Sequence, residues 1–248
     1  MAASSRRPHM SQQTANALAE RVYDRIKADI FDFRLLPGDR FTETEIAERY
    51  KVSRTPVRDA LYRLKREGYL DVAFRSGWNV KPFDFDRFDE LYDLRIVLES
   101  AAIERLCAQE SSVSLDPLKD IWLVPVAERE ADPRRMAELD EAFHCMLMAA
   151  AGNREMAQVH AGLTEQIRVI RRLDFLKENR IGATYDEHAK ILRLIMRRKA
   201  TEAAILLRSH ITQSKNEVRK ITLHMLHEAR ASTPASKPPA KPRARRRA

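Results

Sequence analysis

The chain has little glycine and no long apolar run, and each shortage excludes a class of protein. Only 6 of its 248 residues are glycine, and a chain poor in glycine but rich in helix-forming residues favours helices over sheets. No apolar run approaches the roughly 18 residues that a membrane-spanning helix needs. The N-terminal segment MAASSRRPHM lacks the apolar core of a secretory signal. The sequence therefore predicts a mainly α, soluble protein that contacts no membrane.

Cysteine is also scarce, since Cys107 and Cys145 are the only two in the chain. They do not form a CxxC pair, so the spacing disfavours a disulfide framework or a thiolate zinc site. Each is expected to be a small buried hydrophobic residue. Low cysteine usage of this kind is typical of a reducing compartment, which predicts a cytoplasmic location.

The net charge of +9 is unevenly distributed. The last 18 residues carry six basic side chains and no acid, and without them 39 basic residues face 36 acidic ones. That tail either adds non-specific DNA affinity through counterion release or is a dispensable solvated extension. Residues 49–66 are more informative, because they hold seven basic side chains and one acid. Such clustering indicates a local phosphate-binding surface.

The N-terminal part of the chain predicts three helices. Apolar side chains repeat every four residues from Leu18 to Ile30, which is the period of one helix face. Thr42 and Glu45 have the spacing of a capping box that begins a second helix. Ser53 is expected to cap a third helix.

A hairpin and then a second domain are predicted after these helices. Apolar residues alternate over 70–74, and Arg75-Ser76-Gly77 suits the following turn. Three helices followed by a hairpin are typical of a winged helix-turn-helix. The rest reads as an all-helical bundle, with helices expected near 86–109, 115–130, 134–150, 153–176, 179–198 and 200–228. The predicted organisation is a flexible tail at 1–15, the winged helix-turn-helix at 16–81, a linker at 82–85, the bundle at 86–230 and a disordered basic tail at 231–248.

The start of the third helix carries candidate DNA contacts. A recognition helix enters the major groove by its N-terminus, and Arg54 and Arg58, four residues apart, share one helix face. Arginine can bind guanine through two hydrogen bonds, while Ser53 and Thr55 are short donors suited to phosphate. Gly77 would let the wing backbone approach the minor groove closely. The alternative is a solvated basic helix without a DNA partner.

Several motifs of residues 16–81 carry a family resemblance: Leu36-Pro37-Gly38, Ile46-Ala47-Glu48, Val52-Ser53-Arg54-Thr55-Pro56-Val57-Arg58 and Glu67-Gly68. They closely resemble the GntR family of bacterial transcription regulators. The resemblance implies a homodimer that binds an inverted-repeat operator in double-stranded DNA, usually as a repressor. It places the DNA contacts at Thr44, Ser53, Arg54, Thr55, Pro56, Arg58 and Gly77.

Two residues depart from the pattern of that family. Thr44 stands where many members have a base-reading arginine, so the preferred DNA sequence is expected to differ. Lys51 stands where a turn glycine is common. If that turn requires a positive φ, the lysine costs about 1 kcal/mol.

A candidate metal site is predicted in the helical bundle. Asp140 and His144 are four residues apart, so both project from one helix face. His188 and His210 lie on later predicted helices. One carboxylate and three imidazoles suit Zn²⁺, Ni²⁺ or Mn²⁺. The alternative is that the i, i+4 pair is ordinary surface or core.

These residues also carry a resemblance, to the metal-binding FCD sensor domain of the FadR branch, and six helices look like its VanR-like subgroup. The motifs are Asp140-x-x-Phe143-His144, Gly152-Asn153, Glu187-His188 and the late His210. The resemblance implies a metal that anchors a small carboxylate effector, and it implies that Arg95 binds the end of the effector that points away from the metal. Arg95 could instead pair with Glu99, four residues on. Arg168 is a weaker effector candidate that could belong to a solvated face, and His160, His224 and His227 are expected to be ordinary histidines without a convergent partner.

The sequence therefore supports a transcription regulator that responds to a metal-anchored acid, and not an enzyme. A regulator for which the metal itself is the signal is an alternative. A metal-dependent hydrolase with an activated water is a further alternative, although it leaves the DNA-binding motif unexplained.

Overall fold

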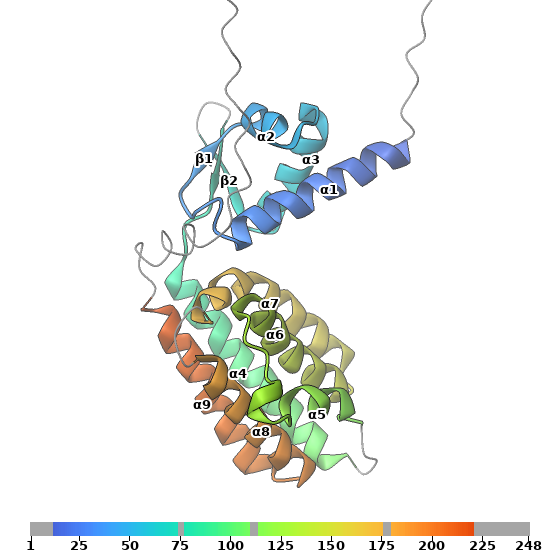
Figure 1. Cartoon of the computed structure of the whole chain (residues 1–248), viewed down its shortest axis with the longest axis vertical. Helices are drawn as coiled ribbons and strands as arrows, with labels where there is room; N and C mark the ends of the chain where they lie inside the picture. The colour runs from blue at the N-terminus through green and yellow to red at the C-terminus, as the bar shows by residue number, and fades with distance from the viewer. Residues whose placement is uncertain (1–11, 74–76, 110–113, 176–179, 221–248) are drawn as a thin grey trace, which may run out of the picture. The chain divides into compact units, whose positions relative to one another are not determined.

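The computed structural model describes residues 12–73, 77–109, 114–175 and 180–220. Several expectations lie wholly or partly outside these residues: the two tails, Phe74 with the Arg75-Ser76 turn, His224 with His227, and the ends of the helices expected over 153–176, 179–198 and 200–228. The chain divides into two units, here called the head, up to Phe83, and the helical domain, from Asp84 (Figure 1). Most described residues are helical, which confirms the predicted mainly α fold class.

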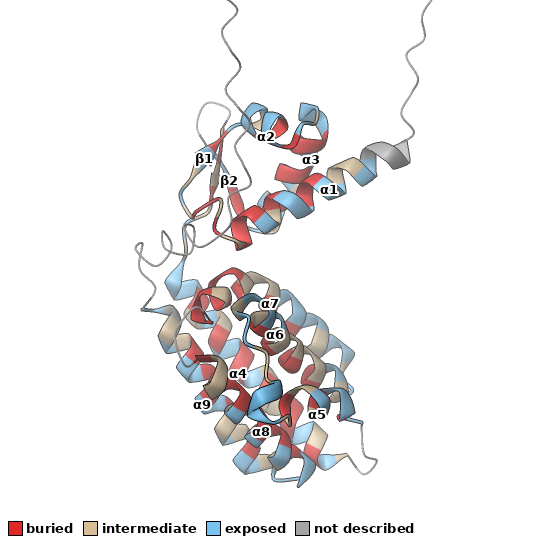
Figure 2. Cartoon of the chain, in the orientation of Figure 1, coloured by how far each residue is buried: buried red, intermediate tan, exposed pale blue. Residues whose placement is uncertain are grey.

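The head is built on three helices that share one core. They are α1 (Gln12–Phe31), α2 (Glu43–Tyr50) and α3 (Arg54–Arg66). The four-residue apolar repeat of α1 faces α3, so that Val22 and Ile26 are buried together with Leu61. Figure 2 shows this buried side of α1 and α3. The apolar positions that the period predicts are therefore the ones that pack α1 against α3 and stabilise the helix-turn-helix.

A small antiparallel sheet completes the head. Its strands are β1 (Arg40–Phe41), β2 (Leu70–Ala73) and β3 (Gly77–Val80), in the order β1-β3-β2. β2 and β3 pair antiparallel with Leu70 opposite Val80, which confirms the predicted hairpin. β1 was not predicted, because a strand of two residues is too short to show the alternation of apolar and polar residues that identifies a strand.

The turn between α2 and α3 contains one backbone conformation that glycine normally supplies. Thr42 caps α2, and the capping box with Glu45 is confirmed by both of its hydrogen bonds. Lys51 follows α2 with a φ of 57°, in the left-handed region. Ser53 stands at the N-cap position of α3, but its hydroxyl makes no capping hydrogen bond in the described structure. Ser53 therefore does not stabilise α3 in the way that the sequence suggested.

The helical domain is a bundle arranged around its first helix. Its helices are α4 (Phe85–Ala108), α5 (Asp116–Trp122), α6 (Pro133–Ala150), α7 (Arg154–Asp174), α8 (Arg180–Met196) and α9 (Ala200–Val218). α4 packs against α6, α7, α8 and α9, and its Tyr92 and Ile103 are fully buried. None of the helices that the structure describes is long and apolar enough to cross a lipid bilayer.

One predicted helix is wrong in its length. The helix expected over 115–130 ends at Trp122, and only a single 3-10 turn, Val126–Glu128, follows. Pro125 explains the break, because proline has no N–H to donate and disfavours helical backbone in the residue before it. Gly152 ends α6 with a φ of 73°, and the Asn153 side chain then caps α7.

We expect Lys51→Gly to stabilise the protein. Glycine adopts the left-handed region without the steric cost that a Cβ brings, so the free energy of unfolding should rise by about 0.5–1 kcal/mol. Denaturant unfolding measures the change. Lys51→Ala is the matched control, because it keeps the Cβ and should give no gain. A lower midpoint for the glycine variant than for the wild type would contradict this account of the turn.

Candidate metal centre and DNA-binding surface

The residues expected to contact DNA surround the start of α3. Arg54, Thr55 and Arg58 are exposed there, as are Thr44 on α2 and Ser53. One predicted contact does not share this exposure: Pro56 is buried, because its ring lies on the side of α3 that faces the core of the head. An exposed set of two arginines and three hydroxyls is an arrangement that can bind phosphates and base edges.

Glu43 connects the two arginines, and the sequence analysis missed it. Its carboxylate accepts hydrogen bonds from Arg54 Nη2 at 3.2 Å and from Arg58 Nη2 at 2.9 Å. The hydrogen bonds from Arg58 and then Arg54 outweigh partial burial and lower the pKa of Glu43. Glu43 therefore holds both guanidinium groups on one side of the helix-turn-helix. An acid in the first turn of α2 was the only available signal, and it looked like an ordinary helix-dipole residue.

Gly77 begins β3 at the base of the wing. Its φ is not in the left-handed region. An added Cβ would meet Ala73 Cβ at 3.5 Å and the Phe41 carbonyl oxygen at 3.6 Å, which are ordinary contacts. The fold of the head therefore does not itself require glycine at this position.

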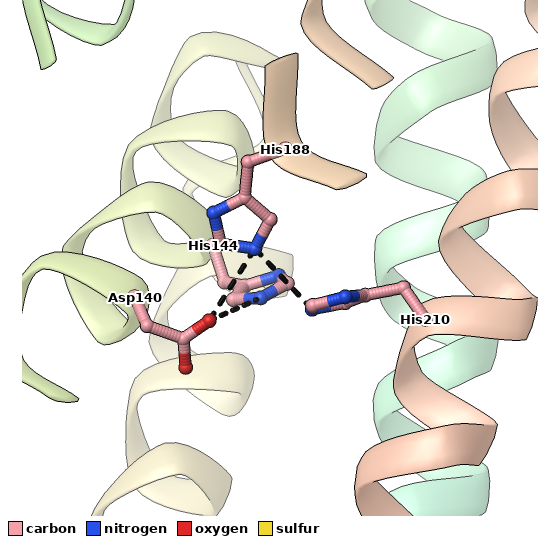
Figure 3. A group of neighbouring side chains, drawn as sticks. All are labelled: Asp140, His144, His188 and His210. Carbon is pink, nitrogen blue, oxygen red and sulfur yellow. Dashed lines mark hydrogen bonds and ion pairs between the residues drawn. The ribbon is translucent and has the colours of Figure 1, made fainter. Parts of the chain in front are cut away.

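Four buried side chains converge in the helical domain. Asp140 and His144 come from successive turns of α6, His188 from α8 and His210 from α9 (Figure 3). One ligand atom from each lies within 4.8 Å of all the others. The structure thus brings together the four residues that the sequence named, and this group is called the Asp-His cluster below.

The three imidazoles present the same nitrogen to the centre of the Asp-His cluster. His188 Nε2 lies 3.2 Å from His210 Nε2 and 3.3 Å from Asp140 Oδ1. His144 Nε2 lies 3.7 Å from that same oxygen and has no hydrogen-bond partner in the described structure. A buried imidazole nitrogen without a partner is unfavourable unless something else binds it. The donor set fits a divalent metal ion.

The outward-facing atoms of the cluster are held by charged side chains. His144 Nδ1 lies 2.6 Å from Glu99 Oε2, and His210 Nδ1 lies 2.6 Å from Glu187 Oε2. Arg171 donates to Asp140 Oδ2. A carboxylate that accepts a hydrogen bond from Nδ1–H leaves the Nε2 lone pair of the neutral ring facing inward, which is the form that binds metal.

The electrostatics of the cluster favour the protonation states that metal binding needs. Burial lowers the pKa of His144 and His188, with further lowering from Arg95 and His210, respectively. Burial alone would raise the pKa of Asp140, but Arg171 and the histidines hold it well below its ordinary value. Neutral imidazoles and an ionised carboxylate require no proton loss before an ion binds.

Aromatic side chains close one side of the cluster. Phe143 stacks on His188 at 3.8 Å between ring centroids, with 8° between the ring planes. The ring of Trp122 stands at 73° to the same imidazole, with 4.2 Å between the ring centroids. Phe143, Trp122 and His188 are fully or almost fully buried. Their packing fixes the orientation of His188, whose Nδ1 has no hydrogen-bond partner within the described chain.

The two arginines expected at the effector have different surroundings. Arg95 is buried, and its Nε donates to Glu99 at 2.6 Å, while its Nη2 has no partner in the described structure. Arg168 is only half-buried and pairs with Glu141 at 2.6 Å, as expected of a solvated face. Arg171, one turn later on α7, is buried, and its Nη1 is without a partner there. Arg171 could not be predicted from the sequence, because its burial depends on which face of α7 meets the bundle.

Comparison with known protein families agrees with both parts of the structure. The model described as bacterial regulatory proteins, gntR family, matches residues 18–80, and the FCD domain model matches residues 90–213. The chain belongs to the GntR family. It is therefore a transcription regulator with a DNA-binding helix-turn-helix and an effector-binding FCD domain. The relatives are regulators rather than enzymes, so the hydrolase alternative has no support.

Individual GntR-type proteins resemble the chain over most of its length. The Nta operon transcriptional regulator of Aminobacter aminovorans is 31% identical over 189 residues, which cover 76% of this chain and 89% of the relative. The uncharacterized regulator YdhC of Bacillus subtilis is 26% identical and covers 85% of this chain and 93% of its own. The structure of E. coli McbR/YncC has a TM-score of 0.61 at 17% identity, covers 82% of this chain and 97% of its own, and shows a shared fold.

We expect Asp140→Asn to destabilise the metal-free protein strongly. The substitution leaves the buried Arg171 without its ionised partner, which typically costs about 3–5 kcal/mol. Chemical unfolding in the presence of EDTA measures the loss. Glu138→Gln on the exposed side of the same helix is the control and should change stability by less than about 0.5 kcal/mol. Equal effects of the two substitutions would show that the Arg171–Asp140 pair contributes little.

Proposed function

We propose that the chain is a homodimeric repressor whose helical domain holds a divalent metal ion and, beside it, a small carboxylate effector. The observation that carries the proposal is the convergence of the Asp-His cluster. Three inward Nε2 atoms and one carboxylate oxygen meet in a buried place, and FCD domains are often metal-binding. No comparable set of ligands occurs elsewhere among the residues that the structure describes.

The metal would be held by Asp140, His144, His188 and His210. Imidazole and carboxylate together suit Zn²⁺, Ni²⁺ or Mn²⁺. When bound, the ion supplies a positive charge and free coordination positions for the oxygen atoms of an acid. Arg171 and Glu187 keep Asp140 and His210 oriented toward it.

The acid is supported by the two buried arginines. Arg95 Nη2 and Arg171 Nη1 are donors without protein partners among the described residues. Burial raises the pKa of Tyr92 and of Cys145, and the positive charges of both guanidinium groups act against that rise, which supports a location of both groups near the same part of the bundle. A carboxylate is the usual partner of a buried guanidinium group. Arg171 thus replaces Arg168 in the effector site that we propose.

DNA binding is assigned to the exposed start of α3. Arg54 and Arg58, held by Glu43, would read base edges, while Ser53, Thr55 and Thr44 would contact phosphates. Gly77 would bring the wing close to the minor groove. Binding of the acid would favour one arrangement of the two heads in the dimer, and DNA affinity would fall if that arrangement does not match the operator.

Thermal unfolding with metals and acids tests the sensor. Zn²⁺, Ni²⁺ or Mn²⁺ should raise the melting temperature, and one class of small carboxylate should raise it further only in the metal-loaded protein. A ligand at a hundredfold its Kd adds about 2.7 kcal/mol. EDTA and His188→Ala should both abolish the response. A shift with metal alone, together with metal-dependent DNA binding, would instead identify the metal as the signal.

Selection from a random DNA library tests the head. The enriched fragments should contain an inverted repeat, and Arg58→Ala should weaken binding by about 1–3 kcal/mol and relax the preference at one base pair of each half-site. Lys65→Ala, in the last turn of the same helix, is the control and should leave that preference unchanged. If no fragment is enriched at modest salt, the head is not a sequence-specific DNA reader.

A further inference from the structure

Glu99, in the middle of α4, is a buried acid beside the Asp-His cluster, and its carboxylate contacts three other buried side chains. Only 2% of its surface is exposed. Its Oε2 accepts from His144 Nδ1 at 2.6 Å. Its Oε1 accepts from Arg95 Nε at 2.6 Å and lies 2.9 Å from His160 Nε2. None of the four members of the cluster lies on α4 among the described residues. Glu99 is the α4 residue whose side chain contacts a member, His144.

His160 is part of the same network, contrary to the expectation that it is an ordinary histidine without a convergent partner. It is fully buried on α7, and its other nitrogen lies 3.4 Å from Thr164 Oγ1. Arg95 approaches Glu99 from α4 itself. Oε1 of Glu99 is therefore held by side chains from two helices, Arg95 on α4 and His160 on α7. These contacts fix the position of Oε2 beside His144 Nδ1.

The fixed oxygen has a consequence for His144. Because Oε2 accepts a hydrogen bond from Nδ1–H, the ring cannot turn over or exchange tautomers without losing a buried, charge-assisted hydrogen bond. Its Nε2 then carries no proton and points toward the centre of the cluster, 3.7 Å from Asp140 Oδ1 (Figure 3).

We propose that Glu99 is a positioning residue of the metal site: it fixes His144 for the ion, and Arg95 and His160 in turn fix Glu99. The inference rests on the proposed metal function and adds a residue on α4 to it. Arg95 Nη2 is also one of the donors proposed to bind the effector acid. The Glu99 carboxylate therefore contacts both a residue of the proposed metal site, His144, and a residue of the proposed acid site, Arg95.

The affinity of the full-length protein for Co²⁺ tests the proposal, measured by competition with a chelator and by the visible absorption of the bound ion. Glu99→Gln should weaken Co²⁺ binding by about ten- to a hundredfold and change the absorption spectrum. The amide cannot accept from both His144 and Arg95, because one of its two atoms is itself a donor. Glu104→Gln, on the exposed side of α4, is the matched control and should bind like the wild type.

The outcomes separate the two proposals. If the wild type does not bind Co²⁺, the proposed metal function fails. If the wild type binds and Glu99→Gln binds with the same affinity and spectrum, Glu99 only supports the fold and the inference is overturned. If Glu99→Gln does not fold, Glu99→Asp takes its place, because it keeps the negative charge beside Arg95 but shortens the side chain by one methylene and withdraws the carboxylate from His144. Glu99→Asp should bind Co²⁺ at least about tenfold more weakly than the wild type, and wild-type affinity and spectrum would overturn the inference.

Discussion

Pairing of buried charges is the constraint on which the helical domain depends. Asp140 is ionised in the core chiefly because Arg171 donates to it, with help from the neighbouring histidines, and either charged group alone would be very costly to bury. The same rule explains Arg95 beside Glu99, and Arg180 between Asp174 and Glu187. In each case one of the acids, Asp140, Glu99 or Glu187, also contacts a histidine of the Asp-His cluster. The bundle uses these pairs to keep polar ligand atoms in place where water is excluded.

A related pairing organises the head, but at its surface. Glu43 binds two arginines of α3 in a place open to solvent, where the pairs contribute little to stability. These pairs instead orient Arg54 and Arg58, because both long side chains, which would otherwise sample many rotamers, bind the same Glu43 carboxylate. DNA phosphates can compete for such exposed arginines, whereas the buried pairs of the helical domain are not accessible in that way. Arginine–carboxylate pairs therefore fix the buried cluster of the helical domain, whereas at the surface of the head they leave the arginines accessible to another anion.

Much of the fold and of the candidate metal site could be predicted from local patterns. The helix period predicted the α1 contact, the capping box predicted the start of α2, and the i, i+4 spacing placed Asp140 beside His144. The unfavourable turn at Lys51 was also foreseen. The patterns failed where a signal was too short or ambiguous: β1 has two residues, and the segment after Trp122 looked helical until Pro125 was taken into account.

The sequence by itself determined which elements form and which side chains have the chemistry to bind metal or DNA, because period, caps and residue type are local properties. Only the tertiary structure decided which of these side chains share a buried site. Arg171 and not Arg168 contacts the cluster. Glu99 and Glu187 contact its histidines from α4 and α8, and His160 on α7 contacts Glu99. Burial and long-range pairing follow from how helix faces pack against one another, and no local pattern contains that information.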